Sequence, residues 1–123
     1  MSNTGWIGVD LDGTLAHYES FIGPEHIGAP IPAMVERVQR WLADGYEVRI
    51  FTARVSHDET MPRIRDAAAA MKAIRLWCRE HIGVELRVTN VKDYAMIELW
   101  DDRAVQVSPN TGEPVGKSTR GLA

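Results

Sequence analysis

The sequence contains a single cysteine, Cys78, among its 123 residues. One cysteine excludes an internal disulfide framework and any metal site built from cysteines alone. No apolar run approaches the roughly 18 residues that a membrane span requires. The first residues carry neither the basic segment nor the apolar stretch of a signal peptide. These absences favour a reduced, cytoplasmic protein that has no membrane partner.

An excess of positive charge is also missing. The 14 Lys and Arg residues stand against 17 Asp and Glu residues, which gives a net charge of −3 and a pI near 5.8. This balance argues against nucleic acid as a general electrostatic partner, although it does not exclude it. The rest of the composition is ordinary for a globular protein, with 45% hydrophobic and 25% charged residues. A chain of this length and composition predicts one domain with a folded core.

Short apolar segments alternate with amphipathic ones along the chain. Helices are expected from Pro32 to Asp44 and from Pro62 to about His81, because apolar side chains recur there at intervals of three and four residues. The expected strands are residues 6–10, 46–52, 86–89 and 94–99, with a short fifth candidate at 104–107. Strands that alternate with helices predict an α/β fold with a mostly parallel sheet.

Two stretches lack a regular pattern. Residues 17–32 carry several glycines and prolines, which predicts an irregular loop. Residues 109–123 are rich in Gly, Pro, Ser and Thr, which predicts a flexible tail. The expected folded core therefore comprises residues 1–108.

Polar residues that could carry chemistry come directly after the expected strands. In a parallel sheet the ligand site lies beyond the carboxyl ends of the strands, which meet at one edge. The residues placed at this edge are Asp10, Asp12, Thr52, Lys92, Asp101 and Asp102. Four carboxylates a few ångströms apart repel one another, so a bound cation and Lys92 are the candidates for compensation. Oxygen ligands favour a hard cation such as Mg²⁺.

The spacing of Asp10 and Asp12 suits two different roles. Asp10, at the end of a strand, can present its carboxylate as a nucleophile. Asp12 can protonate a leaving oxygen and later activate water, and such proton transfer is typically worth about 10²–10⁴ in rate. Thr52 and Lys92 can hold phosphoryl oxygens as negative charge builds on them.

Ala53 and Arg54 directly follow Thr52 and are further candidates for substrate binding. Arg54 could recognise a second anionic group on the substrate, or it could be a solvated loop residue. The sequence leaves both interpretations open.

The segment Asp10-Leu11-Asp12-Gly13-Thr14 resembles the first motif of the haloacid dehalogenase-like superfamily, and Thr52, Lys92 and Asp101-Asp102 resemble its three later motifs in order. The resemblance spans residues 6 to about 107. It implies a three-layer Rossmann-like core and an aspartyl-phosphate intermediate on Asp10, with Asp12 as general acid/base. It also implies phosphate binding by Thr52 and Lys92. The implied Mg²⁺ ligands are Asp10, the backbone carbonyl of Asp12, and either Asp101 or Asp102.

Two features narrow the resemblance. The superfamily's phosphatases and phosphotransferases carry an aspartate at the position of Asp12, whereas its dehalogenases lack an acid there. Thr52 lies 40 positions after Asp12, and Lys92 lies 40 positions after Thr52, which leaves no room for a separate cap domain. Residues 17–32 are then the only candidate lid. Capless members often screen the site by forming oligomers or by acting on large substrates, and four tryptophans agree with a homo-oligomer.

The expected function is therefore a Mg²⁺-dependent phosphomonoester hydrolase. Its expected substrate is a small phosphorylated metabolite, either a sugar phosphate or a nucleotide, and a nucleic-acid end phosphate is the alternative. A phospho-acceptor signalling domain of the receiver type is the alternative from another class. Receivers place the acidic metal-binding pair after the first strand, whereas the pair Asp101-Asp102 comes last here.

Overall fold

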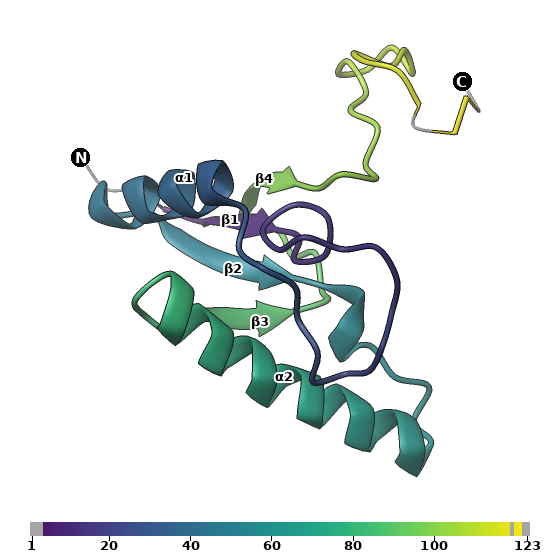
Figure 1. Ribbon diagram of the computed structural model, residues 1–123. Coiled ribbons are helices and arrows are strands. Elements are labelled where there is room, and N and C mark those ends of the chain that lie inside the picture. Colours follow the sequence, from purple (N-terminus) through teal and green to yellow (C-terminus); the bar gives the residue numbers. More distant parts are fainter. Residues whose placement is uncertain (1–3, 119, 122–123) are drawn as a thin grey trace.

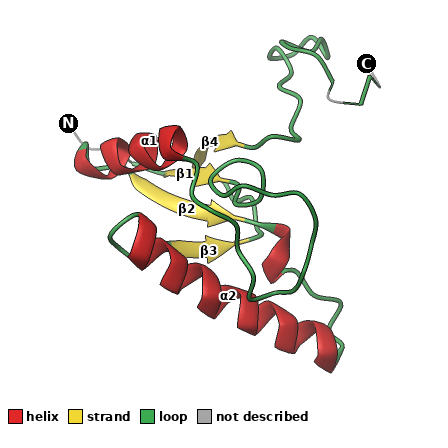
Figure 2. Ribbon diagram, viewed as in Figure 1, coloured by secondary structure: helices red, strands yellow, loops and turns green. Residues whose placement is uncertain are grey.

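The structure is a computed structural model that describes residues 4–118 and 120–121. Strands and helices alternate along most of the chain (Figure 1), and Figure 2 separates them by type. The elements are β1 (Trp6–Val9), α1 (Pro32–Ala43), β2 (Glu47–Phe51), the short 3₁₀ helix η1 (Ala53–Val55), α2 (Met61–His81), β3 (Arg87–Thr89) and β4 (Met96–Trp100).

The strands form one sheet in the order β3-β2-β1-β4, and every neighbouring pair is parallel. The α/β fold with a parallel sheet is therefore confirmed, and the expected helices and main strands match to within two residues at each end. All four strands end at the same edge. The register places Val9 beside Ile50 of β2 and beside Trp100 of β4. The residues directly after β1 therefore lie next to those directly after β4.

Local sequence explains where the two helices begin and end. Pro32 occupies the first turn of α1, where its missing N–H costs nothing. The helix ends at Asp44-Gly45, where Gly45 has a φ of +89° that a side-chain-bearing residue seldom adopts. The buried side chains of α2 recur at three to four positions and include Ile74 and Cys78. Burial raises the pKa of the Cys78 thiol to about 12, as suits a core residue.

Both helices pack on one face of the sheet. Side chains of α1 and α2 join a single hydrophobic cluster with Ile7, Val9, Val48 and Ile50, which alternate along β1 and β2 and so share a face. The crossovers β1–α1–β2 and β2–α2–β3 step in the same direction across the sheet. Right-handed crossovers of this kind place successive helices on the same side.

The opposite face is crossed by the connection from β3 to β4, residues 90–95. Trp6 donates from its indole Nε1 to Asp93 at 2.8 Å, and Arg49 lies over the Trp6 ring at 4.4 Å and reaches Asp93 at 3.4 Å. The third layer in the described part of the chain is therefore this short connection rather than a helix. It holds the first strand against the outer strand β4.

The prediction of a fifth strand at 104–107 is wrong. The structure gives this stretch one isolated bridge, between Val107 and Pro114, and the sheet has four strands over the described residues. The chain turns away directly after β4, because the Arg103 amide bonds back to the Asp101 carboxylate at 2.7 Å. Ser108 and Glu113 then join in a small turn within the expected tail. No helix in the described ranges is both long and apolar enough to span a bilayer.

Truncation of a fully buried side chain on α2 tests this packing. Ile74→Ala removes a side chain with no exposed surface, and we expect a loss of about 2–5 kcal/mol in the free energy of unfolding. Leu76→Ala, on the exposed side of the same helix, is the matched control and should change stability by about 0.5 kcal/mol or less. Urea denaturation of both variants measures the difference, and equal losses would contradict the packing described.

Candidate active site

The carboxyl-terminal edge of the sheet gathers three carboxylates from two neighbouring strands. Asp10 follows β1, and Asp101 and Asp102 follow β4. The Asp10 amide donates to the Trp100 carbonyl at 2.8 Å, which extends the β1–β4 pairing to the first acidic residue. One oxygen from each of the three carboxylates lies within 4.8 Å of the others. The arrangement therefore depends directly on the parallel pairing of β1 with β4.

Thr14 lies between two of these carboxylates. Its hydroxyl is 3.4 Å from the Asp10 carboxylate and 3.5 Å from the Asp102 carboxylate, and it accepts a hydrogen bond from the Asp102 amide at 3.1 Å. A threonine can satisfy several polar neighbours at once because its hydroxyl both donates and accepts. Thr14 thus ties the turn after β1 to the residues after β4.

Residues 11–16 form the tight turn that carries this threonine. The carbonyl of Leu11 accepts hydrogen bonds from the amides of Thr14, Leu15 and Ala16. Gly13 sits in the turn with a φ of +87°, and a Cβ placed there would lie 2.4 Å from an Asp102 oxygen. A residue with a side chain seldom adopts this φ, and its Cβ would also displace the flexible end of the Asp102 side chain. The backbone conformation of the turn therefore favours glycine at position 13.

The crowded carboxylates change the acidity of Asp10. Burial, followed by the neighbouring carboxylates of Asp102 and Asp101, raises the pKa of Asp10 from 3.8 to about 8. At neutral pH either a proton on Asp10 or a positive charge nearby stabilises this environment. Carboxylate oxygens alone form the cluster, and this donor set fits a hard divalent cation. Asp10, Asp101 and Asp102 are the residues that could hold such an ion.

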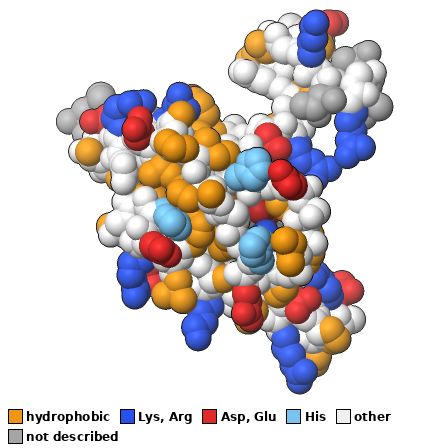
Figure 3. Space-filling model, in the orientation of Figure 1, with side chains coloured by type: hydrophobic (Ala, Val, Ile, Leu, Met, Phe, Trp, Pro, Cys, Tyr) orange, Lys and Arg blue, Asp and Glu red, His pale blue; other side chains and the backbone are white. Residues whose placement is uncertain are grey.

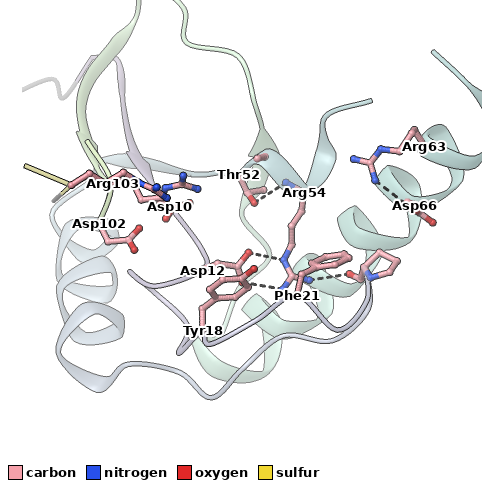
Figure 4. A pocket seen from close by; sticks show the side chains of 13 residues that line it. Asp10, Asp12, Tyr18, Phe21, Thr52, Arg54, Arg63, Asp66, Asp102 and Arg103 are labelled. Atoms are coloured by element: carbon pink, nitrogen blue, oxygen red, sulfur yellow. Dashed lines mark hydrogen bonds and ion pairs between the residues drawn. The ribbon is translucent and has the colours of Figure 1, made fainter. Parts of the chain in front are cut away.

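Asp12 differs from the three clustered carboxylates because it is paired with an arginine. Arg54 donates from Nε and Nη2 to the two oxygens of Asp12 at 2.7 and 3.0 Å, which is a bidentate ion pair. The Arg54 side chain is 6% exposed and that of Asp12 is 20% exposed. Figure 4 shows the pair facing the same cavity as Asp10 and Asp102. The structure thus gives the two aspartates of the first motif different surroundings.

Thr52 and Ala53 follow β2 at the same sheet edge. Thr52 is buried, and its hydroxyl accepts a hydrogen bond from the Arg54 amide at 3.1 Å, which caps η1. Its own amide donates to the Thr89 carbonyl at 2.9 Å. The sheet and the 3₁₀ turn therefore fix the start of the loop that carries Arg54.

These residues border one cavity of about 600 Å³. Such a volume lies within the range of small-molecule sites. The lining residues that come from outside the expected set are Tyr18, Phe21 and Pro24 of the loop, Arg63 and Asp66 of α2, and Arg103 and Arg120 of the C-terminal segment. Figure 3 shows basic side chains along the segment that leaves β4. The position of Arg103 directly after Asp102 could have indicated that it lies near the site. Nothing in the sequence indicates the same for Arg120.

Lys92 is not among the residues that line the cavity. It is exposed in the connection 90–95, which crosses the opposite face of the sheet. Its binding to phosphate stays a prediction. Asp101 is also absent from that lining, although its carboxylate belongs to the acidic cluster.

Comparisons with known proteins support the fold. No model of a protein family matches the chain, and no curated sequence matches it. A solved structure from Bacteroides thetaiotaomicron, described as a conserved protein coded by a locus of that organism, is similar with a TM-score of 0.56 and 24% identity. The similarity covers 84% of this chain and 79% of that chain. At this identity it shows a shared α/β fold.

The raised pKa of Asp10 predicts a pH dependence of stability. The folded protein holds this proton more tightly than the unfolded chain, so the stabilising contribution is complete below pH 3.8 and is lost as the pH rises to about 8. We expect Asp10→Asn to gain stability relative to the metal-free wild type across this range. Denaturation in the presence of a chelator, at a series of pH values, measures the difference. If the free energies of unfolding of the two proteins change with pH in parallel, the pKa of Asp10 is not raised in the folded protein.

Proposed function

We propose that this protein is a phosphomonoester hydrolase that depends on a divalent cation, with Mg²⁺ as the expected ion. One observation carries the proposal. A single cavity is bordered both by Asp10, which belongs to the carboxylate cluster, and by Asp12, whose carboxylate is bound by Arg54. Phosphoryl transfer to an aspartate needs a nucleophilic carboxylate beside a positive charge, and it needs a second residue that acts as general acid and base.

Asp10 is the nucleophile in this proposal. One of its carboxylate oxygens attacks the substrate phosphorus, and the bond between phosphorus and the leaving oxygen breaks. The product of this step is an aspartyl-phosphate on Asp10. Its position after β1, with its amide fixed to the Trp100 carbonyl, holds the carboxylate at the edge of the cavity. A preformed position of this kind lowers the entropic cost of the attack.

Asp12 carries the proton in both half-reactions. It first gives a proton to the leaving oxygen, and then takes a proton from the water that attacks the aspartyl-phosphate. The second step releases inorganic phosphate and restores the Asp10 carboxylate. The same residue serves as acid and then as base because each half-reaction reverses the proton requirement of the other.

The phosphoryl oxygens have several candidate partners. Thr52 and Ala53 border the cavity beside Asp10. Lys92 is a further candidate, although it is not among the residues that line the cavity. A divalent cation held by Asp10, Asp101 and Asp102 would neutralise the cluster and stabilise negative charge on the transferred group.

The proposed substrate is a small phosphorylated metabolite, such as a sugar phosphate or a nucleotide. A cavity of about 600 Å³ accommodates a leaving group of that size, and its rim carries the basic residues Arg63 and Arg103. Among the described residues, the loop 17–31, α2 and the C-terminal segment all contribute to the lining of the cavity. We also propose that a second copy of the chain screens the site.

Release of phosphate from an aryl phosphate, with and without Mg²⁺, tests the assignment of the nucleophile. We expect Asp10→Asn to abolish the Mg²⁺-dependent activity. The matched control is Asp66→Asn, which changes an aspartate at the rim of the same cavity but outside the cluster, and this variant should retain most of the wild-type rate. Equal activity of wild type and Asp10→Asn would refute the proposal.

The role of Asp12 is tested by the leaving group. Asp12→Asn should lower kcat by about 10²–10⁴-fold for an alkyl phosphate, whose leaving oxygen needs a proton. For an aryl phosphate with an acidic phenol, the loss in the first step should be much smaller. Comparison of kcat for the two substrates measures this effect. The same loss for both leaving groups would remove Asp12 from the role of general acid.

A further inference from the structure

Arg54 uses most of its hydrogen-bonding capacity within the protein. A guanidinium has five N–H donors. Two bonds go to the oxygens of Asp12, and Nη1 donates to the backbone carbonyls of Gly23 at 3.2 Å and Pro24 at 3.4 Å. The ring of Phe21 lies 5.3 Å from the guanidinium carbon. With a side chain only 6% exposed, Arg54 has little surface left for a substrate anion.

The two ends of the loop 17–31 are held independently of Arg54. The His17 amide donates to the Ala29 carbonyl at 2.8 Å, and the Ile31 amide donates to the Leu15 carbonyl at 2.8 Å. On α2, Trp77 donates from its indole Nε1 to the Gly28 carbonyl at 3.0 Å. The base of the loop is therefore fixed to the core.

The tip of this loop, residues 18–25, is attached differently. Tyr18, Phe21 and Ile22 expose 42%, 56% and 71% of their surfaces, so apolar burial holds the tip weakly. Arg54 gives it two hydrogen bonds and a ring contact. One buried side chain thus joins the tip of the loop to Asp12.

We propose that Arg54 is a positioning residue that latches the loop 17–31 over the cavity and orients the Asp12 carboxylate at the same time. The latch stands on geometry alone, whereas the effect on Asp12 rests on the proposed phosphatase function. A bidentate pair fixes the plane of the carboxylate. Each Asp12 oxygen keeps a second lone pair that the two bonds from Arg54 do not use.

This assignment replaces substrate binding as the role of Arg54. Binding of a second anionic group is left to Arg103 and Arg63, which line the cavity on other sides. Arg63 is paired with Asp66 at 3.6 Å and donates to the Ser56 carbonyl, and neither contact involves the loop. Arg63 therefore serves as a matched control for Arg54.

Hydrogen exchange of backbone amides tests the latch without any activity assay. The reporter is the His26 amide, which donates to the Gly23 carbonyl at 3.3 Å, the same carbonyl that accepts from Arg54. Arg54→Gln should speed its exchange by about tenfold or more, because the charge-assisted bonds to the tip and to Asp12 are lost. Asp12→Asn keeps the shape of the pair but removes its charge, so it should act in the same direction by a smaller factor. Arg63→Gln should leave exchange in the loop unchanged. Unchanged amides around Ile74 in α2 establish that each variant is folded.

Kinetics test the effect on Asp12. Arg54→Lys keeps the positive charge but loses the planar guanidinium that binds both oxygens of Asp12. We expect kcat to fall about tenfold or more while KM changes less than about twofold. A rise in KM with an unchanged kcat would assign Arg54 to substrate binding and overturn the positioning role. Loop exchange that is the same in wild type and Arg54→Gln would overturn the latch. A wild-type protein without phosphatase activity would refute the proposed function and leave the exchange result to decide the latch.

Discussion

The parallel pairing of β1 with β4 is the constraint on which the site depends. It sets Val9 beside Trp100, and so the carboxylates of Asp10, Asp101 and Asp102 must share one edge of the sheet. Like charges at this separation destabilise the fold unless they are protonated or neutralised. Burial of Asp10, together with these neighbouring carboxylates, raises its pKa to about 8. Either a proton on Asp10 or a bound cation relieves this repulsion, and the proposed chemistry uses a cation.

The pairing of β1 with β4 is itself secured from the opposite face. Residues 90–95 carry the chain from β3 across the sheet to β4, and Asp93 fastens this crossing to Trp6 and Arg49. On the other face both helices pack over a continuous core. The acidic edge, the turn around Gly13 and the loop latched by Arg54 are thus supported by different parts of one small scaffold. β1, the strand that leads to Asp10, is buried along its whole length.

Much of this could be predicted from the sequence, for physical reasons. Periodicity at α1 and α2 and the apolar strands defined a parallel sheet, and the rule that parallel strands end at one edge then placed Asp10 near Asp101 and Asp102. The partners of Arg54 could not be predicted, because its bonds to Asp12 and to the loop join residues 30 or more positions apart. The path of the connection 90–95 could not be predicted either, because no local sequence pattern records that it crosses the far face of the sheet. The binding of phosphate by Lys92, which lies on this connection, stays a prediction.

The most direct test of the proposed mechanism is to locate a phosphoryl group on the protein during turnover. In the proposed mechanism Asp12→Asn slows breakdown of the intermediate, so this variant is mixed with an aryl phosphate and Mg²⁺, quenched in acid and examined by peptide mass spectrometry. We expect one phosphoryl group on the peptide that contains Asp10, and none in the corresponding Asp10→Asn protein. Mg²⁺-dependent hydrolysis with no phosphoryl group on Asp10, or with the group on another residue, would contradict the mechanism.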